Sequence, residues 1–186
     1  WRMSTNPNRT ADEYAVWLTQ LLALKTLKLR DIDSIIIANV VPETAFNLRH
    51  FCEQYFDISP MVVGARNLDL GLDIRIDNPD ELGADRIVNA VGANDIYDGP
   101  LIIIDFGTAT TFDITEADGG YAGGLIAPGI NLSLEALYNA ASRLPRITLE
   151  PQPNSQISEN KYSVIGKSTR SAMQAGIYWG YILSLI

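Results

Sequence analysis

Apolar residues in the first half of the chain recur with two spacings, one typical of helices and one typical of buried strands. A capping box, Thr10-Ala-Asp-Glu13, precedes apolar positions at helical spacing and predicts a helix over about residues 11–26. The run "SIIIANVV" ends at Pro42 and predicts a buried strand, followed by a helix over about 43–56 and a short strand in "PMVVG". Alternating strands and helices indicate an α/β fold.

The middle of the chain combines one long helical pattern with three strand patterns. "NPDELGADRIVNAVGANDIYDG" offers Asn78 as a cap and Pro79 at the first helical position, and the predicted helix continues to Gly99. Strands over 101–105 and 109–115 and a third apolar run, "YAGGLIA", follow with short links. Such links favour an antiparallel meander.

The last third is predicted to contain two helices separated by a loop. One helix should cover about 132–142 and the other should start near Ser168. Between them, "PQPNSQISEN" is rich in Pro, Asn and Ser, and we expect a mobile loop there. The chain opens on Trp1 without an initiator methionine and closes on the uncapped pattern "GIYWGYILSLI". We therefore expect a piece of a longer protein.

Composition narrows the class of function. The 186 residues include 14 basic and 22 acidic side chains, a formal charge of −8. No basic cluster is interleaved with aromatics, which argues against nucleic-acid or membrane partners. One cysteine and one histidine exclude a disulfide framework and a four-ligand Cys/His zinc site, and Cys52 is expected to be a packed thiol. Without a membrane-span or signal pattern, a cytoplasmic protein is expected.

The stretch "LIIIDFGTATTFDI", residues 101–114, carries the first candidate site. Its apolar run predicts a strand buried on both faces that ends at Asp105, a carboxylate that would cost several kcal/mol to bury unless a cation or a donor met it. The following turn, Gly107 to Thr111, offers backbone N–H groups and hydroxyls to a phosphate. The alternative is a tight hairpin in which Asp105 caps its own turn.

Two further clusters could serve a nucleotide or a small acid. "GGLIAPG", residues 123–129, could let a flat base or ribose lie against backbone, although such glycines are also common in turns. In "GADR", Gly83 inside the predicted helix would cost about 1 kcal/mol, which suggests close packing against it. Asp85 could accept a hydroxyl proton and Arg86 could hold a carboxylate. The alternative is a solvated pair near a helix start.

One apparent phosphate motif is rejected. "GKST", residues 166–169, resembles the end of a P-loop, but Lys161 stands where its first glycine is required and no strand precedes it. It is interpreted as a helix start capped by Ser168 or Thr169. No G-x-G-x-x-G fingerprint is present in the sequence.

With these motifs in order, the chain resembles the type III pantothenate kinases of the acetate and sugar kinase, heat-shock ATPase and actin superfamily. The resemblance rests on "RTADEY", "NPDELGADRIVNAVGA", "IIIDFGTATTFDI", "GGLIAPGI" and "VIGKSTRSAMQAGIYWGY". It implies two ribonuclease-H-like (actin-like ATPase) domains with mixed sheets flanked by helices, here 1–99 and 100–186, both incomplete at the chain ends. It also implies a homodimer that phosphorylates pantothenate with ATP, the first step of coenzyme A biosynthesis.

The resemblance further assigns roles to individual residues. It implies that residues 83–86, namely Gly83, Ala84, Asp85 and Arg86, contact pantothenate together with Thr169, and that Asp85 accepts the proton. It implies that Gly107, Thr108 and Gly124 contact ATP. Asp105 would be the ligand of a monovalent cation, potassium or ammonium, and Mg²⁺ would accompany the nucleotide.

One departure from the family pattern is that its first phosphate motif, D-x-G-N-T on an N-terminal strand, is absent. The chain as given is therefore expected to be inactive alone. Two alternative functions remain open: a non-catalytic ATP-fold regulator of gene expression, and a heat-shock-type ATPase acting on proteins. The intact acidic motifs argue against the regulator, and the short chain and the Asp-Arg pair argue against the ATPase.

Overall fold

The computed structural model describes residues 1–141, 143–148 and 164–183. The chain divides into two compact units. The first, unit 1, comprises Trp1–Ile103 and Asp113–Gly123, and the second, unit 2, comprises Ile104–Phe112 and Gly124–Ile186. The predicted two-domain ribonuclease-H-like organisation, with a boundary near residue 100, stays a prediction.

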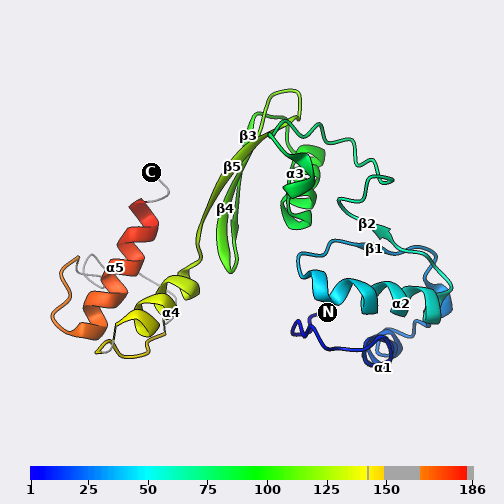
Figure 1. Cartoon of the computed structure of the whole chain (residues 1–186), viewed down its shortest axis with the longest axis horizontal. Coiled ribbons are helices and arrows are strands. Elements are labelled where there is room, and N and C mark those ends of the chain that lie inside the picture. The colour runs from blue at the N-terminus through cyan, green and yellow to red at the C-terminus, as the bar shows by residue number, and fades with distance from the viewer. Residues whose placement is uncertain (142, 149–163, 184–186) are drawn as a thin grey trace. The chain divides into compact units, whose positions relative to one another are not determined.

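Two helices and a small sheet form the first part of unit 1 (Figure 1). Helix α1 (Ala11–Ala23) and helix α2 (Ala45–Phe56) pack together around a core made of Ala11, Ala15, Phe51 and Cys52. The predicted capping box is confirmed, because the backbone N–H of Thr10 donates to Glu13 Oε2 at 2.8 Å. Cys52 is a packed thiol with 1% exposure, and burial raises its pKa.

The strand predicted to end at Pro42 is much shorter than expected. Strand β1 (Ile36–Ile37) pairs in parallel with β2 (Met61–Val62), with Ile36 opposite Met61. The side chain of Asn39 explains the early end, because it accepts from the N–H of Val41 and donates to the C=O of Val41, both at 3.0 Å. Those bonds turn the backbone away from the ladder.

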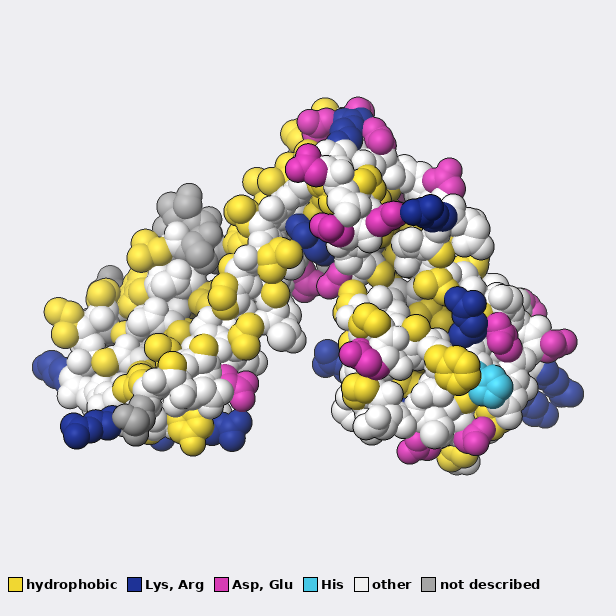
Figure 2. Space-filling view, viewed as in Figure 1, with side chains coloured by type: hydrophobic (Ala, Val, Ile, Leu, Met, Phe, Trp, Pro, Cys, Tyr) yellow, Lys and Arg dark blue, Asp and Glu magenta, His cyan; other side chains and the backbone are white. Residues whose placement is uncertain are grey.

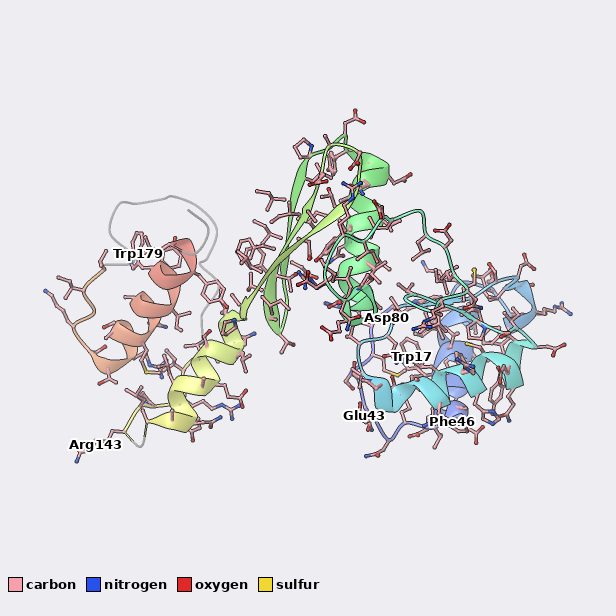
Figure 3. The ribbon with its side chains drawn as sticks, turned by 45° about the horizontal axis from the view of Figure 1, so that its top comes forward. Trp17, Glu43, Phe46, Asp80, Arg143 and Trp179 are labelled. Carbon is pink, nitrogen blue, oxygen red and sulfur yellow. The ribbon has the colours of Figure 1, made fainter. Side chains whose placement is uncertain are left out.

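The predicted helix from Pro79 to Gly99 is two elements. One turn of 3₁₀ helix (Pro79–Glu81) is followed by extended backbone and then by α3 (Ala84–Ile96), whose N-cap is Gly83. Asp80, which is labelled in Figure 3, lies in the 3₁₀ turn and pairs with Arg66 at 2.9 Å. The buried face of α3 packs into a second core made of Val63, Leu82, Ala84, Ile87, Ala90 and Tyr121.

Three consecutive strands form the predicted meander. They are β3 (Leu101–Phe106), β4 (Ala109–Thr115) and β5 (Tyr121–Pro128), hydrogen-bonded in chain order. Links this short require antiparallel neighbours. The expectation that β3 is buried on both faces is wrong: Ile102 is 71% exposed and Phe106 is 60% exposed. These alternating side chains lie on one face of β3, and the described part of the chain leaves that face uncovered. Figure 2 shows hydrophobic side chains gathered over the strands.

Helices α4 (Ile130–Ala140) and α5 (Thr169–Leu183) complete the described part of unit 2. The start of α5 near Ser168 is confirmed, since the N–H of Ser171 donates to Ser168 Oγ at 3.1 Å. The predicted loop "PQPNSQISEN" lies outside the described residues. Within the described ranges, every helix is too short or too polar to cross a bilayer. The predicted α/β class is confirmed.

Candidate functional site

The start of α3 holds the first cluster of predicted site residues. Gly83 caps the helix, Ala84 is buried and Asp85 is exposed. Asp85 Oδ1 accepts a hydrogen bond from the N–H of Arg86 at 2.9 Å. The same oxygen lies only 2.6 Å from the position that a Cβ on Gly83 would occupy. The absence of a side chain at Gly83 therefore makes room for the Asp85 carboxylate. The expectation that Gly83 lies inside a helix and destabilises it is wrong, because Gly83 precedes the first residue of α3.

Arg86 reaches from α3 into the sheet. Its Nε donates to Asp113 Oδ1 on β4 at 2.6 Å, and Tyr121 Oη on β5 donates to the same oxygen at 2.6 Å. The guanidinium carbon also lies 5.8 Å from the centroid of the Tyr121 ring. Asp113 and Tyr121 are both completely buried, while the Arg86 side chain is 15% exposed. We call residues 83–86, Asp113 and Tyr121 the α3 cluster.

Inside the α3 cluster, the charge of Arg86 balances that of the buried Asp113, and the exposed Asp85 adds one further negative charge. Arg86 provides the cation that a buried carboxylate such as Asp113 requires. Burial and the hydrogen bond to Asp113 raise the pKa of Tyr121, so the phenol stays protonated and remains a donor at neutral pH. One group is left over, because Arg86 Nη2 is buried and has no hydrogen-bond partner within the described part of the chain.

The turn between β3 and β4 holds the second cluster, which lies in unit 2. Asp105, Gly107 and Thr108 are exposed. The expectation of a buried Asp105 is therefore wrong, since this end of the edge strand β3 is open. The N–H of Gly107 donates to the C=O of Ala109 at 2.9 Å, so this donor is already engaged within the turn. We call Asp105–Thr108 the β3–β4 turn.

The glycine-rich stretch "GGLIAPG" contacts the β3–β4 turn at its last residue. The N–H of Gly129 donates to the C=O of Thr108 at 2.9 Å. A Cβ on Gly129 would lie 2.3 Å from that same carbonyl oxygen, closer than any side chain can approach. Gly124, further back on β5, is exposed. Two motifs that are separate in the sequence thus meet through backbone contacts.

Thr169 is the first residue of α5 and is exposed. It lines an open hollow between α4 and α5 with, among others, Leu137, Lys167, Ser168 and Met173. The structure therefore places Thr169 in unit 2 with the β3–β4 turn, whereas the residues of the α3 cluster belong to unit 1.

Sequence reasoning missed Asp113 and Tyr121. The sequence places Thr111, Asp113 and Thr115 at alternating positions of the predicted strand, and the structure shows that all three are buried. An acidic residue on the buried side of a strand requires a cationic or donor partner. No comparable sequence signal marked Tyr121 as that donor.

The β3–β4 turn offers a cation one carboxylate, that of Asp105. The described ranges contain no group of three or more His, Cys, Asp or Glu side chains that could hold a metal ion. One exposed carboxylate, Asp105, can share a weakly bound monovalent cation with water or with a ligand. Tight binding of a divalent ion by the turn alone would require more oxygen ligands.

Comparison with known proteins gives a consistent result. The family model described as type III pantothenate kinase matches residues 1–185. The type III pantothenate kinase of Caulobacter vibrioides is 53% identical over 182 residues, which is 98% of this chain and 67% of the relative. That of Rhodospirillum rubrum is 56% identical over 182 residues, again 98% of this chain and 67% of the relative. The chain thus spans about two thirds of the length of these relatives.

A solved structure shares the fold. It is described as a conserved Baf family transcriptional activator from Campylobacter jejuni and superimposes with a TM-score of 0.53. The match covers 84% of this chain and 65% of that one, at 23% sequence identity. At that identity the likeness concerns the fold alone.

Proposed function

The chain belongs to the type III pantothenate kinases, enzymes that phosphorylate pantothenate with ATP at the first step of coenzyme A biosynthesis, and we propose that its α3 cluster binds pantothenate. The observation that carries the proposal is Arg86 Nη2, a buried donor without a partner among the described residues. A carboxylate of a small acid would satisfy it. Asp85 is exposed beside Arg86 along α3, as a group that meets a substrate hydroxyl must be.

In this proposal Asp85 orients the acceptor hydroxyl and takes its proton late in the reaction. Phosphoryl transfer depends mainly on alignment of the attacking oxygen and on balancing phosphate charge, so the base contributes chiefly by positioning. Arg86 holds the pantothenate carboxylate by a charge-assisted hydrogen bond. Gly83 keeps the space that the Asp85 carboxylate occupies.

We assign the ATP side of the reaction to the β3–β4 turn and Gly124. Gly107 and Thr108 would contact the phosphates, and Asp105 would hold potassium or ammonium. When bound, Mg²⁺ and the monovalent cation would supply the positive charge that the ATP phosphates need. The exposure of Asp105, Gly107 and Thr108 supports this assignment because a ligand can reach them.

The cation assignment is tested by exchanging salts. Turnover of the full-length protein should require potassium or ammonium in addition to Mg²⁺. Full activity in sodium-only or Tris-only buffer would contradict a role of Asp105 in monovalent-cation binding.

The function itself is tested by calorimetric titration of the full-length protein with pantothenate, followed by a turnover assay with ATP. A kinase binds pantothenate and converts it. A non-catalytic regulator would show no turnover, and a protein-directed ATPase would hydrolyse ATP without binding pantothenate. Either of these results would overturn the proposal.

We also propose that the protein is a homodimer and that Thr169 is a further pantothenate contact. Exposed apolar side chains on α5, such as Leu183 at 70% exposure, support an interface there. Sedimentation of a monomer at micromolar concentration would count against the dimer. Thr169→Ala should raise KM for pantothenate without changing KM for ATP, and an unchanged pantothenate KM would remove this contact from the site.

A further inference from the structure

The guanidinium of Arg86 is held by groups from two neighbouring strands. Asp113 Oδ1 accepts from Arg86 Nε at 2.6 Å, and Tyr121 Oη donates to that same oxygen at 2.6 Å. The Tyr121 ring also faces the guanidinium at 5.8 Å. Because Asp113 and Tyr121 are completely buried, neither can turn toward solvent. The direction in which Arg86 presents its remaining donors is therefore fixed by side chains of β4 and β5.

One of those remaining donors is unmet. Arg86 Nη2 is buried and finds no acceptor within the described residues. A buried donor without an acceptor destabilises a folded protein, so its presence indicates an acceptor outside the described residues. The opposite charge of Asp113 largely cancels that of Arg86. An arriving anion would thus be bound by a directed hydrogen bond more than by net charge, and the orientation of the guanidinium would decide its affinity.

We propose that Asp113 and Tyr121 are positioning residues that aim Arg86 Nη2 at a carboxylate oxygen of the phosphoryl acceptor. The proposal rests on the proposed binding of pantothenate by the α3 cluster. Tyr121 acts through Asp113, and Asp113 acts through Arg86. Neither residue needs to touch the substrate.

Tyr121→Phe in the full-length protein is the first test, because it removes only the hydroxyl and leaves the Arg86–Asp113 pair in place. KM for pantothenate should rise about three- to tenfold, the effect of one hydrogen bond, while KM for ATP stays unchanged. Tyr55→Phe is the matched control, since Tyr55 Oη donates to Asp12 Oδ1 at 2.5 Å and packs against the separate core between α1 and α2. It should leave both KM values unchanged.

Asp113→Asn is the second test. It keeps the shape of the side chain but removes the charge that fixes Arg86, so KM for pantothenate should rise more than in Tyr121→Phe, by about ten- to a hundredfold. If this variant does not fold, Tyr121→Phe alone decides. A lower melting temperature with an unchanged pantothenate KM in Tyr121→Phe would overturn the proposal, because the residue would then have a structural role only.

Arg86→Lys separates this proposal from the proposed function. If the wild-type protein does not bind pantothenate in calorimetry, the proposed function fails. If the wild type binds, Arg86→Lys weakens binding and Tyr121→Phe binds as tightly as the wild type, only the positioning role fails. Weaker binding by both variants supports both proposals.

Discussion

The α3 cluster and the β3–β4 turn are built in different ways. In the α3 cluster, side chains from a helix and two strands bind one another, and Asp113 at its centre is completely buried. In the β3–β4 turn, backbone groups of Gly107 and Thr108 hydrogen-bond to backbone groups of Ala109 and Gly129, and Asp105 is exposed. Charge and hydrogen bonds between side chains thus hold the α3 cluster together, whereas backbone hydrogen bonds join the β3–β4 turn to Gly129.

Because of this difference, substitutions in the two clusters should have different effects on the free energy of unfolding and on ligand binding. A substitution of Arg86 or Asp113 breaks a buried pair and should affect folding as well as substrate binding. A side chain exposed on the β3–β4 turn can be changed with little effect on folding, because water replaces what it loses. The four substitutions below test this contrast, from the largest expected effect to the smallest.

Asp85→Asn should give the largest effect on turnover. The amide keeps the shape of the carboxylate but cannot take the proton, so kcat should fall about 10²- to 10⁴-fold with a small change in KM. Steady-state kinetics with both substrates measure this. An Asp85→Asn enzyme within a few-fold of wild type would leave the role of general base without support.

Arg86→Ala should lower the free energy of unfolding by about 3–5 kcal/mol, because it leaves the Asp113 carboxylate buried without its cation. Under the proposed function, the same variant should also raise KM for pantothenate, because it removes the donor to the carboxylate. Arg66→Ala is the matched control: Arg66 and Asp80 form an exposed pair, with side chains 88% and 65% exposed. It should cost at most about 1 kcal/mol in chemical denaturation. Equal losses of unfolding free energy in Arg86→Ala and Arg66→Ala would contradict the stabilising role of the buried Arg86–Asp113 pair.

Gly129→Ala should destabilise the β3–β4 turn by about 1–3 kcal/mol, because the added Cβ would collide with the carbonyl of Thr108. Gly176→Ala in α5 should have the opposite sign. Its Cβ would meet no atom within 4 Å, and alanine is favoured over glycine inside a helix by about 0.5–1 kcal/mol. Thermal unfolding of the two variants gives the comparison, and destabilisation of both by the same amount would show that the backbone contact is unimportant.

Asp105→Asn should have the smallest effect on stability, within about 0.5 kcal/mol, because the side chain is exposed. The substitution should weaken ligand binding only, so that KM for ATP and the potassium concentration required for activity rise together. A large loss of stability with unchanged kinetics would reverse the roles assigned to the two clusters.

Local patterns in the sequence predicted most of the elements. The capping box at Thr10, the helix start at Ser168 and the meander of β3 to β5 each depend on residues close together in the chain, and each is confirmed. The errors occurred where a side chain or a neighbouring strand decides the outcome. Asn39 ends β1 early, and an uncovered face of β3 exposes residues that an apolar run alone suggests are buried.

The candidate sites were predicted only in part, because sequence patterns show neighbours along the chain but not contacts between distant residues. Asp85 and Arg86 are adjacent in the sequence, so their cluster could be recognised from the motif that contains them. Asp113 lies 27 positions from Arg86, and no local spacing indicates that the two form an ion pair. Gly129 was noted as part of a glycine-rich stretch, but its contact with Thr108 depends on how β5 leads into α4.

The carboxylate of Asp85 lies over a residue that has no side chain, which gives position 83 an unusual place in a mutational scan. An alanine there meets the movable end of Asp85 and no backbone atom, so the chain can fold by turning that carboxylate aside. Gly83→Ala should then persist in a selection for protein abundance and be lost in a selection for growth that depends on pantothenate phosphorylation. A position with this divided response would identify the orientation of Asp85, and not only its presence, as a requirement of the enzyme.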